Sequence, residues 1–565
     1  MVFSVLSFRD AGLTNWFGPR VRPEFQSEPG WKRYDSSGGA LNAILMGDKF
    51  DAKDVNQRVP AIPQSELQEG LSGAVAAGDF KRLSVRGGAA SVMGRVGGMA
   101  LQLGTTLVLA RLLSPSDYGL QTMVLTLINL CSLFQDAGLS TATVQRETLT
   151  NQEVSTIFWI NIAVGVVLTA AVAAAGPFLA AFYRDPRLLW LTVASATVFF
   201  FNSLSVQHRS ILNRAMRFTT NVKIDMLSAT LGSVIAIVMA ALGCGYWSLI
   251  CQNVSLPIIT TIAAWIALPW MPGRPRWTPE IRSLLRFGGT VSLNSFVVYV
   301  AYNTEKILLG RYWGAAPLGL YGRAYQLSNL PVQQLTDSSS AVAFPMLSRL
   351  QGDPPRLRRS YLKAHSLLVS VTVPAVIGCA LFADAVVRII LGPKWSGAAP
   401  ILRLLSPTVL VFAVMNPLSW LLRATGLVER SLKIALFIAP CVILGVLAGI
   451  HYGPTGVALG YSTAMVILFV PLVAWAKHGT GITAADYWDC IKRPLIAAGL
   501  AGCAAWLCKL ALQNTLTLIP TAAVGLTAFF AIYAALLLFV MGQRAVYADL
   551  LTHLYPRSQE LPAKC

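Results

Sequence analysis

Residues 303–325 of this 565-residue chain read NTEKILLGRYWGAAPLGLYGRAY, and this stretch decides the predicted fold. It begins with two charged residues, Glu305 and Lys306, inside a segment that is apolar enough to cross a bilayer. It then reaches Arg311, turns over a short loop and re-enters apolar sequence at Leu318. We therefore expect two membrane helices joined by a very short connection.

Six positions of this region have an identical residue 200 positions earlier in the chain. They are Arg86, Gly88, Leu109, Arg111, Gly119 and Leu120, matched by Arg286, Gly288, Leu309, Arg311, Gly319 and Leu320. One ungapped offset predicts an internal repeat, which is a common construction of transporters. Thr105 and Thr106 stand where the second copy has Glu305 and Lys306, so that pair of charges belongs to the second copy alone.

The composition predicts a polytopic membrane protein. Hydrophobic residues make up 55% of the chain and charged residues 13%, against about 25% charged in an average soluble domain. The net charge of +19 is compatible with phosphate or nucleic-acid binding. However, Lys and Arg fall mainly in alternate short loops, as they do when they orient membrane helices, so no nucleic-acid partner is predicted.

Motifs for cofactors, metals and nucleotide-driven motors are missing from the sequence. The nine cysteines form no CxxC pair, the five histidines form no HExxH pair, and there is no GxxxxGK[ST] phosphate loop. We predict no metal site, no cofactor and no ATPase motor.

The predicted organisation is all-α, with about fourteen transmembrane helices in two six-helix lobes plus two C-terminal helices. Residues 1–83 mix Pro, Gly, Ser and charged residues and lack a signal-peptide pattern. We interpret them as a disordered cytoplasmic extension or as the result of a start codon assigned too far upstream. The alternative is a regulatory or partner-binding segment. The predicted parts are 1–83 (extension), 84–284 (N-terminal lobe), 285–478 (C-terminal lobe), 479–541 (two further helices) and 542–565 (cytoplasmic tail).

The predicted spans and the charges of the loops give one consistent topology. The basic loops alternate with outer loops as short as SPSD, GAAP and YGP, so both termini are predicted to be cytoplasmic, which requires an even number of spans. The spans are 87–111, 118–138, 154–182, 188–206, 222–242, 246–270, 287–311, 318–346, 362–391, 399–422, 431–450, 454–476, 491–512 and 516–541.

Basic residues at membrane depth are the first candidates for a substrate site. A charge near the centre of a membrane helix costs at least about 2.5–3.5 kcal/mol, so it usually faces a cavity or a partner. If these side chains converge they form a cationic cavity suited to a diphosphate; the alternative is that they snorkel to the interface. The candidates are Arg95, Lys306, Arg311, Arg323, Arg388 and Arg403.

Acidic residues at depth are candidates for binding a coupling ion. Asp136, Asp225, Glu305, Asp337 and Asp384 lie within or beside predicted spans. Glu305 is the leading candidate, for a coupling or gating role or as part of the substrate cavity, and Asp337 is the second candidate for the coupling ion. The alternative for Glu305 is an internal ion pair that holds its helix in register. Asp384 lies four residues before Arg388, so those two are expected to pair.

Residues 81–476 resemble a known family, the polysaccharide transporter branch of the multidrug/oligosaccharidyl-lipid/polysaccharide (MOP) exporter superfamily. The resemblance is carried by stretches that include LARLLSPSDYGL (109–120), QDAGLSTATVQRE (135–147), ILLGRYWGAAPLGLYGRAYQLSNLPVQQL (307–335), FPMLSRLQ (344–351) and LGPKW (391–395). The resemblance implies two lobes around a central cavity and alternating access. Many relatives have Asp where this chain has Glu305, so the role of that residue transfers with caution.

The function implied by the resemblance is transport and not catalysis. The substrate would be an undecaprenyl-diphosphate-linked oligosaccharide, flipped across the bacterial cytoplasmic membrane with an ion gradient as the energy source. Membrane lipid and polysaccharide polymerase or assembly proteins would be partners. Three alternatives stay open: a cation-coupled drug or small-molecule antiporter, a membrane glycan polymerase or ligase, and a non-transporting scaffold. An outward-facing enzyme site would need a larger outer loop than this chain has.

Overall fold

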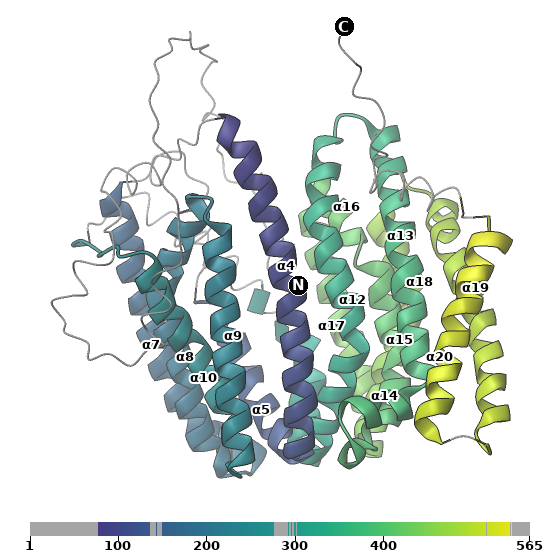
Figure 1. Cartoon of the computed structure of the whole chain (residues 1–565), viewed down its shortest axis with the longest axis horizontal. Coiled ribbons are helices and arrows are strands. Elements are labelled where there is room, and N and C mark those ends of the chain that lie inside the picture. Colours follow the sequence, from purple (N-terminus) through teal and green to yellow (C-terminus); the bar gives the residue numbers. More distant parts are fainter. Residues whose placement is uncertain are drawn as a thin grey trace, which may run out of the picture.

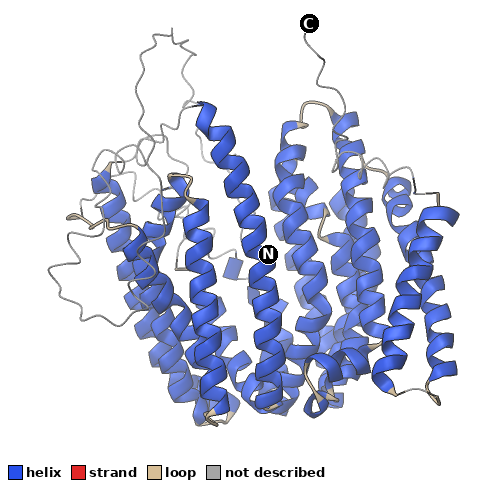
Figure 2. Ribbon diagram, in the orientation of Figure 1, coloured by secondary structure: helices blue, strands red, loops and turns tan. Residues whose placement is uncertain are grey.

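The structure is a computed structural model that describes residues 77–135, 143, 150–275, 292, 295–296, 299–300, 302–425, 427–515, 517–542 and 544. Every regular element in these ranges is a helix, as Figure 2 shows, so the predicted all-α class is confirmed. Nine helical segments among the described residues are long and apolar enough to cross a membrane. Most of the predicted extension 1–83 lies outside the described residues.

The helices form two side-by-side groups, with a helix pair at the edge of the second group (Figure 1). The first group holds α4 (Ala77–Leu112), α5 (Pro115–Ser132), α7 (Asn151–Tyr183), α8 (Arg187–Arg214), α9 (Phe218–Ala241) and α10 (Trp247–Ala267). The second holds the helix over 302–313, α12 (Ala315–Arg349), α13 (Pro354–Leu381), α14 (Ala383–Ile390), η1 (Pro393–Trp395), α15 (Ala398–Met415), α16 (Leu418–Ala424), α17 (Val428–Gly449), η2 (Ile450–Tyr452) and α18 (Gly453–Lys477). The edge pair is α19 (Ala484–Leu512) and α20 (Leu518–Ala535), which continues into η3 (Leu536–Val540).

Two predicted spans are each divided into two helices. The span 362–391 is interrupted at Phe382, between α13 and α14, and the span 399–422 is interrupted before Pro417, between α15 and α16. Proline has no backbone N–H and clashes with the preceding turn, which explains the second break. We have no local explanation for the first.

The start of α5 is fixed by local sequence in the predicted outer loop SPSD. Ser114 is the N-cap, Pro115 is the first helical residue, and Asp117 completes a capping box with Ser114. Such a box satisfies backbone N–H groups that the first turn leaves free, and proline suits the first helical position. The N-terminus of α5 is therefore capped by its own residues at the point where the two groups meet.

Glycines let α17 and α18 pack backbone to backbone. A Cβ atom on Gly449 would lie 2.1 Å from the carbonyl oxygen of Gly456, and one on Gly456 would lie 2.2 Å from that of Gly449. Gly445 and Gly460 repeat this reciprocal contact one turn further on. Small residues at such spacing are the usual basis of close helix packing in membranes.

The edge pair is attached to α13 at several levels. Arg358 on α13 forms an ion pair with Asp486 at the start of α19, with an N–O distance of 2.6 Å. The Tyr533 hydroxyl on α20 donates to the Ser370 carbonyl on α13 at 2.6 Å. The edge pair is thus part of the second group's packing and lies away from the first group (Figure 1).

Candidate functional site

The two groups touch through the N-terminal turns of α5 and α12. A Cβ on Gly119 would lie 1.8 Å from the carbonyl oxygen of Ala315, and a Cβ on Gly319 would lie 1.9 Å from that of Pro115. Real Cβ atoms do not approach so closely, so both positions require glycine. The two contacts are reciprocal, and the 200-residue offset maps one onto the other. We call the end of the molecule at which they lie the joined end.

Helix C-termini at the joined end are capped across the two groups. The buried indole of Trp395 on η1 donates to the Ala110 carbonyl on α4 at 2.8 Å, and Arg111 donates to the Ile389 carbonyl on α14 at 3.2 Å. Lys394 donates in return to the Arg111 carbonyl at 3.4 Å. The last carbonyls of a helix lack intrahelical partners, so these bonds satisfy groups that would otherwise need water.

Arg323 joins the groups with a cation–π contact. Its guanidinium lies 3.8 Å from the ring centroid of Tyr118 on α5, and Nη2 donates to the Gln121 side chain at 3.3 Å. Arg323 also donates to Gln326 on its own helix. The structure thus places this predicted cavity residue in the contact between the groups.

Buried and exposed residues are interspersed along α4 and α12. On α12, Tyr321 and Ala324 are fully buried, whereas Gln333, Ser338 and Val342 are exposed. On α4, Leu109 and Ala110 are buried, whereas the exposed residues on the same helix include Arg95, Val96, Gly97, Gln102 and Gly104. The contact between the groups continues from the joined end along α5, where the carbonyls of Thr126 and Leu133 accept hydrogen bonds from Tyr299 (3.1 Å) and Ser292 (2.7 Å).

Glu305 is buried within the second group. Its side chain is 3% exposed, and its Oε2 atom has no hydrogen-bond partner among the described residues. The phenols of Tyr321 and Tyr325 on α12 and of Tyr461 on α18 lie within range of its charge. A buried carboxyl with a free oxygen and polar hydroxyls nearby can bind a cation or carry a proton.

Lys306 and Glu305 have mostly different partners, as expected for adjacent helical residues. Lys306 Nζ donates to the Asn303 side chain at 2.7 Å and lies 5.5 Å from the Tyr325 ring centroid. It is also 3.9 Å from Glu305 Oε1, so the two charges retain a long ion pair. Lys306 thereby neutralises part of the charge of Glu305.

The remaining predicted basic residues do not gather around Lys306 and Arg323. Arg311 lies over the Phe182 ring on α7, with its guanidinium 5.8 Å from the ring centroid, and Arg95 is exposed on α4. Arg388 lines a pocket beside α20, and Arg403 forms an ion pair with Asp384. The expected Asp384–Arg388 pair is therefore wrong, because tertiary packing brings Arg403 of α15 to the carboxylate instead.

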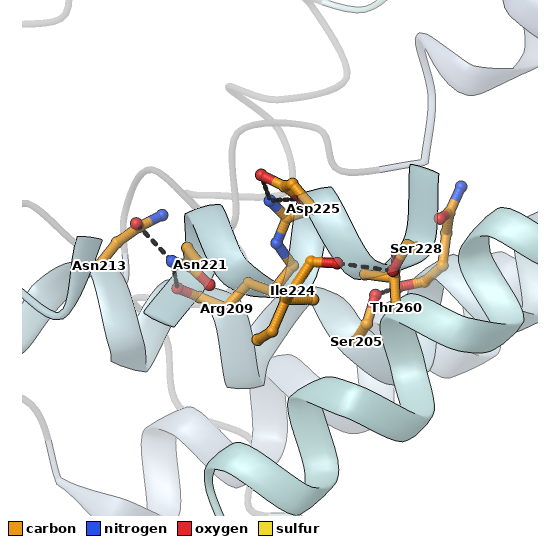
Figure 3. A network of polar contacts seen from close by, with 9 residues as sticks. Ser205, Arg209, Asn213, Asn221, Ile224, Asp225, Ser228 and Thr260 are labelled. Carbon is orange, nitrogen blue, oxygen red and sulfur yellow. Dashed lines mark hydrogen bonds and ion pairs between the residues drawn. The ribbon is translucent and has the colours of Figure 1, made fainter. Parts of the chain in front are cut away.

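Most of the other acidic candidates are accounted for. Asp225 on α9 forms an ion pair with Arg209 on α8 at 2.8 Å, within the polar network that Figure 3 shows between α8, α9 and α10. Asp337 is partly exposed on α12, and Asp136 lies outside the described residues. Among the described residues, Glu305 is therefore the only acidic side chain that is buried.

Several residues of this site were not predicted from the sequence. Tyr118 and Gln121 bind Arg323, and Trp395 bonds to α4. Tyr118 and Trp395 both lie in motifs that carry the family resemblance (109–120 and 391–395), and this was the available signal. Tyr321 and Tyr325 likewise lie in the motif 307–335, whereas Tyr461 lies in none of the quoted motifs.

The joined two-group arrangement defines a transporter fold of the MOP type, as two solved structures support. The structure titled lipid II flippase MurJ in an inward closed conformation aligns with a TM-score of 0.63 at 15% identity, covering 83% of this chain and 100% of that one. An inward-facing multidrug resistance MATE family transporter of the MOP superfamily aligns with a TM-score of 0.52 at 16% identity, covering 68% and 96%.

The chain belongs to the family described as polysaccharide biosynthesis protein, which matches residues 108–400, more than half of its length. It is 26% identical over 373 residues to the lipopolysaccharide biosynthesis protein WzxC of Escherichia coli, which covers 64% of this chain and 74% of that protein. It is 28% identical over 298 residues to the teichuronic acid biosynthesis protein TuaB of Bacillus subtilis, covering 52% and 61%. The predicted membership of the polysaccharide transporter branch of the MOP superfamily is confirmed.

Proposed function

We propose that this protein is a flippase that moves an oligosaccharide, linked to undecaprenyl diphosphate, from the inner to the outer leaflet of the cytoplasmic membrane. The glycan would supply surface or extracellular polysaccharide. Family membership supports this class of substrate, since WzxC and TuaB are named for polysaccharide biosynthesis. The single structural observation that carries the mechanism is the reciprocal backbone contact of the two groups at Gly119 and Gly319.

We propose alternating access of two lobes that share a duplicated fold. The reciprocal contacts of Gly119 and Gly319 support a repeat offset of 200 residues. The lobes would be 84–284 and 285–478, with 479–541 as two added helices and fourteen spans in all. By the distribution of basic loops, the joined end faces outward and both termini are cytoplasmic.

We propose Glu305 as the residue that binds the coupling ion, with Asp337 as a weaker candidate. Glu305 is buried, keeps one oxygen free, and lies on the helix next to the contact between the lobes. Lys306 is its ion-pair partner, and the described residues hold no group of three or more His, Cys, Asp or Glu side chains that could bind a metal, which favours a proton over a metal cation. Protonation would remove the charge that Lys306 now offsets.

The first experiment deletes the gene in a strain that has no second copy. The proposal requires loss of the polysaccharide and accumulation of lipid-linked repeat units on the cytoplasmic face, both restored by the wild-type gene. Unchanged polysaccharide would contradict the proposal. A scaffold would instead leave export intact when the charged residues are neutralised.

A matched pair of glycine variants tests alternating access. Gly119→Leu places a side chain where the Ala315 backbone lies, whereas Gly104→Leu enters open space on α4. We expect Gly119→Leu to reduce polysaccharide export at least tenfold at equal membrane abundance, and Gly104→Leu to export normally. Normal export by Gly119→Leu would show that transport does not require this contact.

The alternative of a cation-coupled drug antiporter is favoured by one observation, the buried carboxyl of Glu305, whose Oε2 atom has no hydrogen-bond partner among the described residues. Such a transporter would move its cationic substrate independently of Lys306 and Arg323. Transport of a lipid-linked diphosphate should instead weaken when these two cations are neutralised. Assay of both substrates in vesicles with Lys306→Gln and Arg323→Gln separates the two functions.

A further inference from the structure

A pocket of about 400 Å³ lies outside the contact between the lobes, beside the edge pair of helices. It is lined by residues from α14, η1, α15 and the first turn of α20, which are Asp384, Arg388, Gly392, Pro393, Ser396, Ala399 and Leu518. Pro393 and Ser396 on its rim are exposed. Its volume falls in the usual range of small-molecule sites, roughly 300–1,000 Å³.

The charges at this pocket are unbalanced in favour of cations. Asp384 accepts a bond from Arg403 of α15, and its Oδ2 atom lies 3.9 Å from Lys509 Nζ of α19. Lys509 is further held by the Leu381 carbonyl at 3.3 Å and by the Phe382 ring. Arg388 is exposed and forms no ion pair within the described residues. Asp384 is thus shared by Arg403 and Lys509, while Arg388 on the same helix has no ion-pair partner among the described residues, so the three cations exceed the single carboxylate by two.

The excess positive charge of Arg388, Arg403 and Lys509 lies at an end of the molecule where basic residues are not expected. The pocket adjoins η1, which contacts α4 at the joined end, and this end faces outward in the proposed topology. Outward loops of membrane proteins are poor in Lys and Arg, so a basic cluster there is not explained by topology. Ile389 and Ile519, the sequence neighbours of the lining residues Arg388 and Leu518, are exposed apolar side chains (41% and 53%).

We propose that this pocket binds the phosphate group of a lipid in the outer leaflet. Arg and Lys donate charge-assisted hydrogen bonds to phosphate oxygens, and the phosphate of a lipid headgroup lies at the level of such an exposed helix end. Arg388 supplies the free donor, Lys509 and Arg403 supply the surrounding positive potential, and Leu518 with Ile519 faces the lipid chains. The candidate residues Arg388 and Arg403 therefore serve a peripheral lipid site and not the transport pathway.

Two lipids carry this chemistry, an anionic phospholipid and the diphosphate of the exported lipid after flipping. Native mass spectrometry of the purified full-length protein distinguishes them, by titration with phosphatidylglycerol, with phosphatidylcholine, and with undecaprenyl diphosphate. Because binding is measured without transport, its failure is separate from failure of the proposed flippase function. The inference does rest on the proposed orientation.

Two variants and one matched control test the assignment. Arg388→Gln removes the free donor, and Ser396→Trp fills the pocket from its exposed rim without changing charge. Arg184→Gln removes an exposed charge from the same end of the first group. We expect phosphatidylglycerol or undecaprenyl diphosphate, but not phosphatidylcholine, to bind, with affinity reduced roughly tenfold or more by the first two variants and unchanged by the control.

The lipid for which the two variants lower the affinity is the source of the phosphate. Binding that is equal for phosphatidylglycerol, undecaprenyl diphosphate and phosphatidylcholine would overturn the proposal. So would selective binding that survives both Arg388→Gln and Ser396→Trp. A melting curve for each variant confirms that a loss of affinity is not a loss of fold.

Discussion

The guanidinium of Arg323 on α12 stacks on the ring of Tyr118 on α5, 3.8 Å from its centroid, and this contact links the two helix groups. The cation has no carboxylate partner among the described residues; its other partners are the side chains of Gln121 and Gln326. An arginine that contacts only an aromatic ring and side-chain amides is held less strongly than an arginine in a buried ion pair. Such a contact can break and re-form during a transport cycle.

Removal of the Tyr118 ring should favour separation of the lobes at the joined end. A cation–π contact contributes about 0.5–2 kcal/mol, which corresponds to a factor of about 2–30 in the population of the joined state. We expect Tyr118→Leu to add a longer component to the distance between spin labels at positions 112 and 389, measured by pulsed electron resonance. Tyr452→Leu, an exposed aromatic change, is the control. Identical distance distributions for wild type and Tyr118→Leu would count against this role.

The indoles of Trp395 and Trp313 offer a comparison between contacts across and within the groups. Trp395 Nε1 donates to the Ala110 carbonyl of the other group, and Trp313 Nε1 donates to the Ile450 carbonyl of its own group. A carbonyl left buried without a donor costs about 1–3 kcal/mol. Trp395→Phe should therefore shift the same spin-label distances outward, whereas Trp313→Phe should lower the melting temperature without shifting them. The opposite assignment of effects would refute the distinction.

Neutralisation of Glu305 should uncouple transport from its driving ion. Glu305→Gln keeps the size of the side chain and removes its titration, so we expect gradient-driven uptake of lipid-linked substrate in vesicles to fall at least tenfold. Glu305→Asp should retain part of the activity, and Asp337→Asn should retain most of it because Asp337 is partly exposed.

The companion variant Lys306→Gln, alone and combined with Glu305→Gln, separates coupling from an internal ion pair. If the pair were only structural, the double variant would restore the activity that each single variant loses. If all three variants exported polysaccharide normally, Glu305 and Lys306 would have no role in transport.

Replacement of a glycine by alanine should lower the melting temperature in the α17–α18 hairpin but not at an exposed position. A methyl group on Gly456 would meet the Gly449 carbonyl at 2.2 Å, whereas Gly499 on α19 has no neighbour within 4 Å. We expect Gly456→Ala to lower the melting temperature of the purified protein by several degrees. Gly499→Ala should leave it unchanged or raise it, since alanine favours the helix by about 0.5–1 kcal/mol over glycine. Equal melting temperatures would show that the hairpin tolerates wider spacing.

The sequence by itself determined the membrane character, the all-helical class and the family. These properties depend on hydropathy along the chain and on short motifs, and both are local. The position of most helices followed as well, because a span of about 20 apolar residues is set by bilayer thickness. The breaks near Phe382 and Pro417 show the limit of this rule, since hydropathy does not change where the backbone turns.

Only the tertiary structure decided which charged residues lie together. Asp384 was expected to pair with Arg388 one turn away, yet it pairs with Arg403, which lies 19 positions later in the chain. Arg323 was predicted as a charged cavity residue, and it stacks on a tyrosine 205 positions earlier. Ion pairs and cation–π contacts depend on distances of a few ångströms between helices, which the helical period does not specify. The repeated glycine at 119 and 319 was visible in the sequence, but its purpose, a reciprocal contact of two backbones, became evident only when the two helix groups were placed against each other.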